Sequence, residues 1–148
     1  MPSWTGYFAR SGSPALKIKV SGPFNPGVEY EAVLDTGFTG FLSIPLTEAI
    51  RLGLILFGTT SVSFANGQTD WRLTARGKID VGTESNIGVA ILEWQSTELL
   101  LGMAFLRQFG KALFVSKTAV ALFDEAELQK LVAANAATAG AAPAQPPP

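Results

Sequence analysis

Residues Glu31–Gly40 read EAVLDTGFTG, an apolar run that favours a β-strand and then leads one carboxylate, that of Asp35, into a Thr-Gly turn. A turn directly after a strand leaves the carboxylate at the open end of that strand. Taken alone, Asp-Thr-Gly is typical of an ordinary turn, because Asp accepts hydrogen bonds from nearby backbone amides and Gly tolerates positive φ. Whether Asp35 is more than a turn residue therefore depends on the rest of the sequence.

A second apolar run, Leu99–Leu101, also ends abruptly in a glycine, Gly102. It predicts another short strand that stops at a turn. The tripeptide Asp-Thr-Gly is not repeated in the chain. Chemistry that needs two equivalent Asp residues would therefore take the second from another copy of the chain.

The composition excludes several kinds of catalysis. The 148 residues are 47% hydrophobic, which is enough for one core and favours a single main domain. The 11 basic and 12 acidic residues are scattered, so no basic stripe suggests nucleic-acid binding. Cysteine and histidine are both absent, which removes Ser-His-Asp, Cys-His and most transition-metal chemistry. We expect no metal and no cofactor, and acid-base chemistry by carboxylates.

The sequence also predicts the compartment. Its N-terminus lacks a charged segment followed by an apolar stretch, so no secretory signal is visible. No apolar run reaches the roughly 20 residues of a membrane helix. These features predict a soluble, cytoplasmic protein with no membrane partner.

Hydrophobic periodicity predicts mostly strands. Alternation indicates a half-buried strand over residues 15–20, and a turn-rich stretch separates it from a strand over 28–34 that runs into Asp35. Proline and glycine positions predict two short helices. The other predicted elements are strands over 41–44, 61–65, 68–75, 76–81, 86–94, 112–116 and 118–123, and helices over 45–52 and 103–109.

Asn66-Gly67 predicts the clearest hairpin of the chain. This dipeptide fits a two-residue turn with positive φ at both positions. After residue 123, Asp124 and Glu127 predict a capping box for a C-terminal helix over 124–134. The Ala- and Pro-rich tail, 135–148, is predicted to be disordered. The main domain is thus expected to span residues 1–123.

The Asp35-Thr36-Gly37 turn and the later Leu-Leu-Gly102 element together resemble the retropepsin-like aspartic proteases, of the bacterial type with one Asp-Thr-Gly per chain. The resemblance covers roughly residues 16–123. It implies an all-β fold, a closed β-barrel with one or two short helices, and a homodimer. In that family each copy contributes half of a site that hydrolyses peptide bonds.

The resemblance also implies roles for individual residues. Asp35 would be the catalytic residue. The Thr36 hydroxyl would reach the partner's loop across the two-fold axis, and Gly37 would keep its amide close to the carboxylate. Thr39 matches a position that can bond the outer carboxylate oxygen, although a simple turn hydroxyl is an equal interpretation. Phe38 stands where retroviral members usually have Ala, so its bulk is expected beside a substrate subsite.

The Asn-Gly hairpin falls where the family has its flap, the hairpin that closes over substrate. The expected tip, which would contact substrate, consists of Ala65, Asn66, Gly67 and Gln68. An ordinary surface hairpin would show the same dipeptide.

Three functions remain open at this point. The first is a homodimeric aspartic endopeptidase acting on a peptide or protein substrate. The second is a catalytically inactive dimerisation or peptide-binding module on the same fold, in which Phe38 blocks substrate. The third is an unrelated small β-barrel that binds a ligand, with Asp35 as a turn residue. Function is decided by the site and not by the fold.

Overall fold

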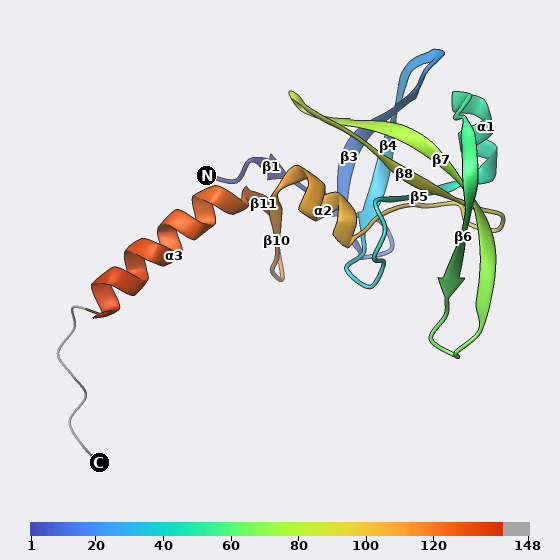
Figure 1. The fold of residues 1–148 in the computed structure, drawn as a ribbon. Helices are drawn as coiled ribbons and strands as arrows, with labels where there is room; N and C mark the ends of the chain where they lie inside the picture. Colours follow the sequence, from blue (N-terminus) through green and yellow to red (C-terminus); the bar gives the residue numbers. More distant parts are fainter. Residues whose placement is uncertain (141–148) are drawn as a thin grey trace.

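The structure, a computed structural model, describes residues 1–140 (Figure 1). Strands dominate it, with three helices among the described residues. The strands are β1 (Trp4–Thr5), β2 (Tyr7–Phe8), β3 (Pro14–Gly22), β4 (Asn25–Leu34), β5 (Leu42–Pro45), β6 (Leu56–Ser63), β7 (Thr69–Val81), β8 (Glu84–Glu93), β9 (Leu99–Leu101), β10 (Lys111–Val115) and β11 (Val120–Asp124). The helices are α1 (Leu46–Leu52), α2 (Met103–Phe109) and α3 (Glu125–Gly140).

The strands form two sheets. The larger has the order β2-β3-β4-β9-β5-β8-β7-β6, and β3 also pairs with β7, through Lys19–Ser21 opposite Lys78–Asp80. The smaller has the order β1-β11-β10. The predicted all-β character is therefore confirmed, and β4, β9 and β5 lie next to one another in the middle of the larger sheet.

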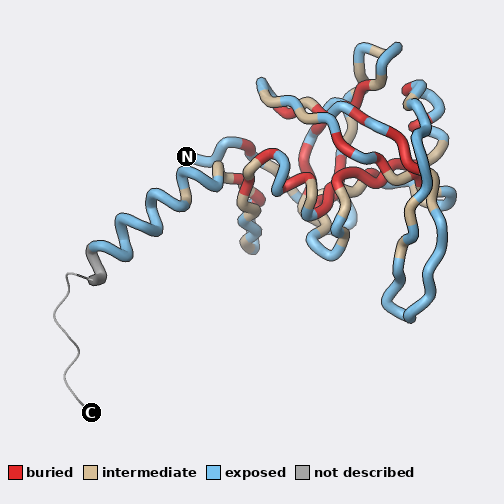
Figure 2. The backbone as a smooth tube through the Cα atoms, viewed as in Figure 1, coloured by how far each residue is buried: buried red, intermediate tan, exposed pale blue. Residues whose placement is uncertain are grey.

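The alternation that predicted β3 matches its burial. Leu16, Ile18 and Val20 are buried, whereas Lys17 and Lys19 are exposed. Successive side chains of a strand point to opposite faces, so one face of β3 packs on the core and the other faces solvent. Figure 2 shows buried backbone where the strands of the larger sheet cross and along α2.

Aromatic side chains join the two sheets. The ring of Trp4, in β1, lies 5.1 Å from that of Phe109 in α2, centroid to centroid. The Phe105 and Phe109 rings are 4.9 Å apart, and Phe41 lies 5.9 Å from Phe105. Offset and edge contacts of this kind are favourable beyond simple burial. Helix α2 is thereby fixed between Phe41, which directly precedes β5, and strand β1.

Lys111 is a buried cation at the same junction. Its side chain is only 1% exposed, and its Nζ lies 2.8 Å from Glu84 Oε2, bonds Asp124 and sits 4.6 Å from the centre of the Trp4 ring. Burial lowers the pKa of Lys111, but the hydrogen bonds to Asp124 and Glu84 outweigh burial and the pKa is raised. The charge stays paired, as a buried charge must.

Both short helices end as predicted. Gly53 and Gly110 follow α1 and α2 in the left-handed conformation, with φ of 64° and 63°. Glycine adopts this conformation without strain and closes the helix.

Several predicted boundaries were wrong. Residues 69–81 form one strand, β7, where two were expected, because β7 continues unbroken from its pairing with β6 to its pairings with β8 and β3. Strands β1 and β2 were not predicted at all, because two-residue strands carry no readable period.

Helix α3 is longer than predicted and extends to Gly140. Alanine has the highest helix propensity, so the Ala-rich sequence past residue 134 continues the helix. The helix projects away from the body (Figure 1), and Leu131 and Val132 are exposed. The rest of the predicted tail, 141–148, lies outside the described residues. No helix within residues 1–140 is both long and apolar enough to cross a membrane.

Candidate active site

Asp35 is held at the end of β4 by its neighbour strand. Strand β4 runs parallel to β9, with Leu34 opposite Leu101, and the Asp35 amide donates to the Leu101 carbonyl at 2.9 Å. This bond continues the ladder one residue beyond the strand. The backbone of the half-buried Asp35 is therefore fixed where the two predicted motif elements meet.

The loop after Asp35 is bonded to the start of α2. The Met103 amide donates to the Phe38 carbonyl at 2.8 Å, and the Ala104 amide to the carbonyls of Thr39 and Gly40, both at 3.2 Å. The first amides of a helix have no partner inside the helix. Here the loop supplies these partners by its backbone, so the start of α2 is held without a side-chain cap.

The Asp35 carboxylate accepts a hydrogen bond within its own turn. The Gly37 amide donates to Asp35 Oδ1 at 2.9 Å, and a Cβ built on Gly37 would lie 3.2 Å from the same oxygen. Thr36 and Thr39 are exposed. One carboxylate oxygen is thus oriented by the backbone, and the Thr36 side chain is accessible to another molecule.

The Phe38 ring folds back over the loop. A Cβ built on Gly40 would lie 2.5 Å from Phe38 Cζ, and one on Gly102 would lie 2.6 Å from Phe38 Cδ2. Phe38 is half-buried, so the ring occupies the space that side chains at these two glycines would otherwise take. The ring packs against the loop's own backbone.

This packing predicts coupled stabilities. Gly40→Ala should lower the free energy of unfolding by about 1–3 kcal/mol, because the new methyl group displaces the Phe38 ring. In the double variant Phe38→Ala/Gly40→Ala the collision is gone. Its loss in the free energy of unfolding should therefore be about 1 kcal/mol smaller than the sum of the two single losses. Urea denaturation of the four proteins measures this. Additive effects would mean that the ring does not rest on Gly40.

The tip of the hairpin β6–β7 differs from the predicted turn. The Phe64 amide donates to the Gln68 carbonyl at 2.8 Å, and the Gly67 amide to the Phe64 carbonyl at 2.9 Å. Among the tip residues only Gly67 has positive φ, 83°, and Asn66 does not. The predicted two-residue turn is therefore wrong. The loop has three residues, Ala65, Asn66 and Gly67, of which the glycine alone takes the left-handed position.

The predicted tip residues, Ala65 to Gln68, are all exposed. In Figure 1 the tip of β6–β7 and the loop between β4 and β5 both project from the lower side of the body. Within one copy of the chain, no hydrogen bond joins the tip to Asp35 among the described residues.

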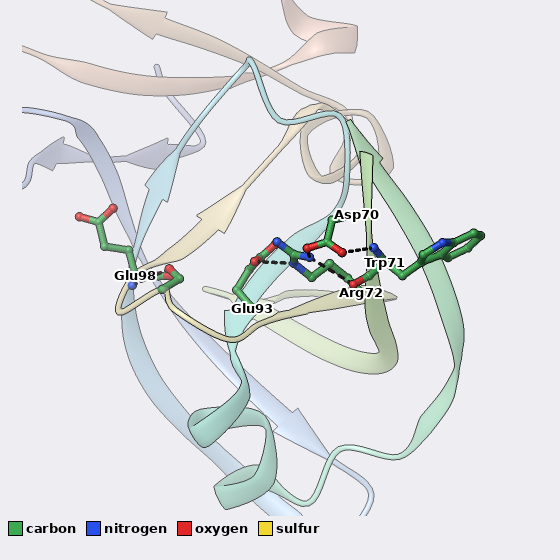
Figure 3. A network of polar contacts seen from close by, with 6 residues as sticks. Asp70, Trp71, Arg72, Glu93 and Glu98 are labelled. Carbon is green, nitrogen blue, oxygen red and sulfur yellow. Dashed lines mark hydrogen bonds and ion pairs between the residues drawn. The ribbon is translucent and has the colours of Figure 1, made fainter. Parts of the chain in front are cut away.

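Sequence reasoning missed one polar network near the base of this hairpin. The Arg72 side chain contacts Asp70 and Glu93 and lies beside Trp71, as Figure 3 shows. No local pattern marks Arg72, since Arg72 and Glu93 come together only through the pairing of β7 with β8. In residues 1–140, no group of three or more acidic residues could hold a metal ion.

Comparison with solved structures identifies the fold. A retropepsin-like aspartic protease from Rickettsia conorii superposes with a TM-score of 0.60 over 80% of this chain and 89% of its own, at 19% identity. EIAV protease, complexed with the inhibitor HBY-793, gives a TM-score of 0.57 over 73% of this chain and 98% of its own, at 14% identity. No family model and no curated protein sequence matches the chain. The chain therefore has a retropepsin-like fold, as the sequence predicted.

Proposed function

We propose that this chain is an aspartic endopeptidase, and that two copies each contribute Asp35 to a shared site. The observation that carries the proposal is the fixed position of Asp35 at the end of β4, bonded to Leu101 on one side and to Gly37 on the other. The retropepsin-like fold supports the same interpretation. A ring of strand pairings, closed by β3 with β7, is consistent with the closed barrel that the family resemblance implies.

The chemistry explains why two copies are needed. One carboxylate must take a proton from the attacking water while another, protonated, polarises the scissile carbonyl. The chain has a single Asp-Thr-Gly, and one carboxylate cannot hold both states at once. Two carboxylates about 3 Å apart share one proton, because both cannot ionise together. A two-fold axis between copies supplies this pair from one residue.

The remaining residues have roles in this proposal. Thr36, which is exposed, bonds the partner's loop, and Thr39 supports the carboxylate. The hairpin β6–β7 acts as the flap, and its tip, Ala65 to Gln68, covers the peptide. Phe38 borders a subsite. Because its ring packs on Gly40 and Gly102, within its own loop, this contact favours the endopeptidase over the inactive module, in which Phe38 blocks substrate.

The test is cleavage of a diverse pool of unstructured peptides, read by mass spectrometry from about pH 4 to pH 8. We expect discrete cuts with a maximum on the acidic side of neutrality. Raising the pH removes the shared proton and lowering it protonates both carboxylates, so activity falls on both sides. Undiminished cleavage at about pH 8, the upper end of this range, would contradict the shared-proton mechanism. If the pool stayed uncut at every pH, the proposed endopeptidase activity would be contradicted.

Thr36 tests the shared architecture. Thr36→Ala should raise the dissociation constant of the dimer by about tenfold, because each interface loses a hydroxyl bond from both copies. Thr36→Ser keeps the hydroxyl and should bind like the wild type. Sedimentation equilibrium over a range of concentrations measures both. A wild type that stays monomeric, or an alanine variant with unchanged association, would contradict this role.

A further inference from the structure

The hairpin β6–β7 leaves the sheet at a defined point. Strand β7 pairs with β8 from Val81 opposite Glu84 up to Thr74 opposite Ile91, where the ladder ends. Its pairing with β6 continues further, to Thr69 opposite Ser63. Beyond Thr74 the hairpin is therefore a ribbon of two strands. Such ribbons are only marginally stable by themselves and depend on side-chain contacts.

In the same register, Arg72 and Glu93 lie two positions beyond Thr74 and Ile91, the last pair of the ladder. Arg72 Nε donates to Glu93 Oε2 at 2.9 Å, which joins the departing arm of the hairpin to the end of β8 (Figure 3). An ion pair of side chains thus takes over where the backbone ladder ends.

The Arg72 side chain makes several contacts, although it sits in a two-stranded ribbon. Its Nη1 bonds Asp70 Oδ2 at 2.5 Å and the Trp71 carbonyl at 3.1 Å, and its guanidinium carbon lies 5.7 Å from the centre of the Phe64 ring. Only 11% of the side chain is exposed. Hydrogen bonds to Glu93 and then Asp70 raise the pKa of Arg72. Arg72 therefore connects three places: the sheet, its own strand and the base of the hairpin tip.

The space beside this ion pair is open. A cavity of about 460 Å³ is lined by Asp70, Arg72, Glu93 and residues 94–96. Because a cavity lies there, tight packing does not fix the angle of the arm on this side. Phe64, Asp70 and Trp71 of the arm are exposed, so their side chains add little packing that would fix its angle.

We propose that Arg72 is a positioning residue whose pairing with Glu93 sets the angle of the hairpin β6–β7 and slows its opening. With the pair intact, the Phe64 side of the hairpin stays close to the sheet. With the pair broken, the ribbon is attached by the ladder that ends at Thr74 and by the packing of Leu73 against the core. If the pair breaks, the hairpin should also close less often over a bound peptide; this consequence rests on the proposed function. The effect of the pair on the motion of the hairpin does not depend on the proposed function.

Hydrogen exchange of the full chain, read by mass spectrometry, tests the motion. In Glu93→Gln and in Arg72→Met, the amides of 60–71 should exchange about tenfold faster than in the wild type, because loss of a charge-assisted bond favours local opening. The matched controls are Asp70→Asn, which alters only the bond within the strand, and Arg76→Met, which removes an arginine of β7 that contacts the Phe57 ring at 5.2 Å. Both controls should leave these amides unchanged, and Arg72→Lys should restore part of the protection.

Two results would overturn the proposal. Unchanged exchange of residues 60–71 in both Glu93→Gln and Arg72→Met would show that the pair does not hold the hairpin. Equally faster exchange of these amides in Asp70→Asn would show that the Arg72–Glu93 pair between β7 and β8 is not what holds the hairpin. If peptide cleavage is detected, Glu93→Gln should raise KM by about fivefold and change kcat less. If no cleavage is found, the exchange result still decides the positioning role, so the two failures are distinguishable.

Discussion

Asparagine in place of Asp35 is expected to abolish peptide cleavage while the fold stays intact. An amide cannot take the proton of the attacking water, and in a homodimer the substitution removes both carboxylates together. The expected loss is about 10⁴-fold or more, which is the upper range for general acid-base catalysis. The Asn side-chain oxygen can still accept the Gly37 amide bond that Asp35 Oδ1 accepts now, so the loop should keep its shape.

Mixing wild-type and Asp35→Asn chains tests the sharing directly. If both copies contribute to one site, an equal mixture should keep about one quarter of the wild-type rate, because only dimers of two wild-type chains work. If each chain works alone, about half the rate should remain. Asp80→Asn, an acidic residue of β7 away from the loop, is the control and should stay active. Cuts that persist in Asp35→Asn would rule out Asp35 as the catalytic residue.

Gly102→Ala should have the largest effect on stability. A Cβ at this position would lie 2.4 Å from the carbonyl oxygens of both Phe38 and Gly40. These carbonyls accept the first amides of α2, so neither can move away without losing a hydrogen bond. Real Cβ atoms do not approach backbone oxygens so closely. We expect a loss of about 3 kcal/mol or more in the free energy of unfolding.

Gly77→Ala is the matched control, because it also adds a methyl group to a buried glycine. Its nearest neighbours would lie 3.8 Å away, in ordinary contact. Urea denaturation should therefore show a small change for Gly77→Ala and a large one for Gly102→Ala. Comparable stability of the two variants would mean that the loop and α2 are not packed as closely as described.

The site loop could be predicted from sequence because its evidence is local. The strand before Asp35, the turn at Gly37 and the strand before Gly102 each follow from short patterns of apolar residues and glycine. The same holds for helices α1 and α2, because a glycine directly after each helix marks its end. Each of these signals lies within a few residues of the element that it predicts, so no tertiary contact had to be known.

Other features depend on contacts between distant segments. The prediction of a two-residue turn at Asn66-Gly67 was wrong because Asn-Gly fits several turn types. The number of loop residues is set by how β6 and β7 pair. The packing of Phe38 on Gly102 and the pairing of Arg72 with Glu93 exist only once the sheet has formed. No periodicity in the sequence indicates them.

The smaller sheet has a consequence for the order of folding. Trp4 of β1 lies opposite Leu122 of β11, and its ring contacts Phe109 and Lys111, all from the last third of the described chain. Contacts between residues so far apart in sequence form slowly, since a long loop has to close first. During synthesis the N-terminal strand must therefore wait until residue 122 has left the ribosome. Strand β1 leaves the ribosome before the rest of the described chain, yet it is among the last strands to reach its native partner.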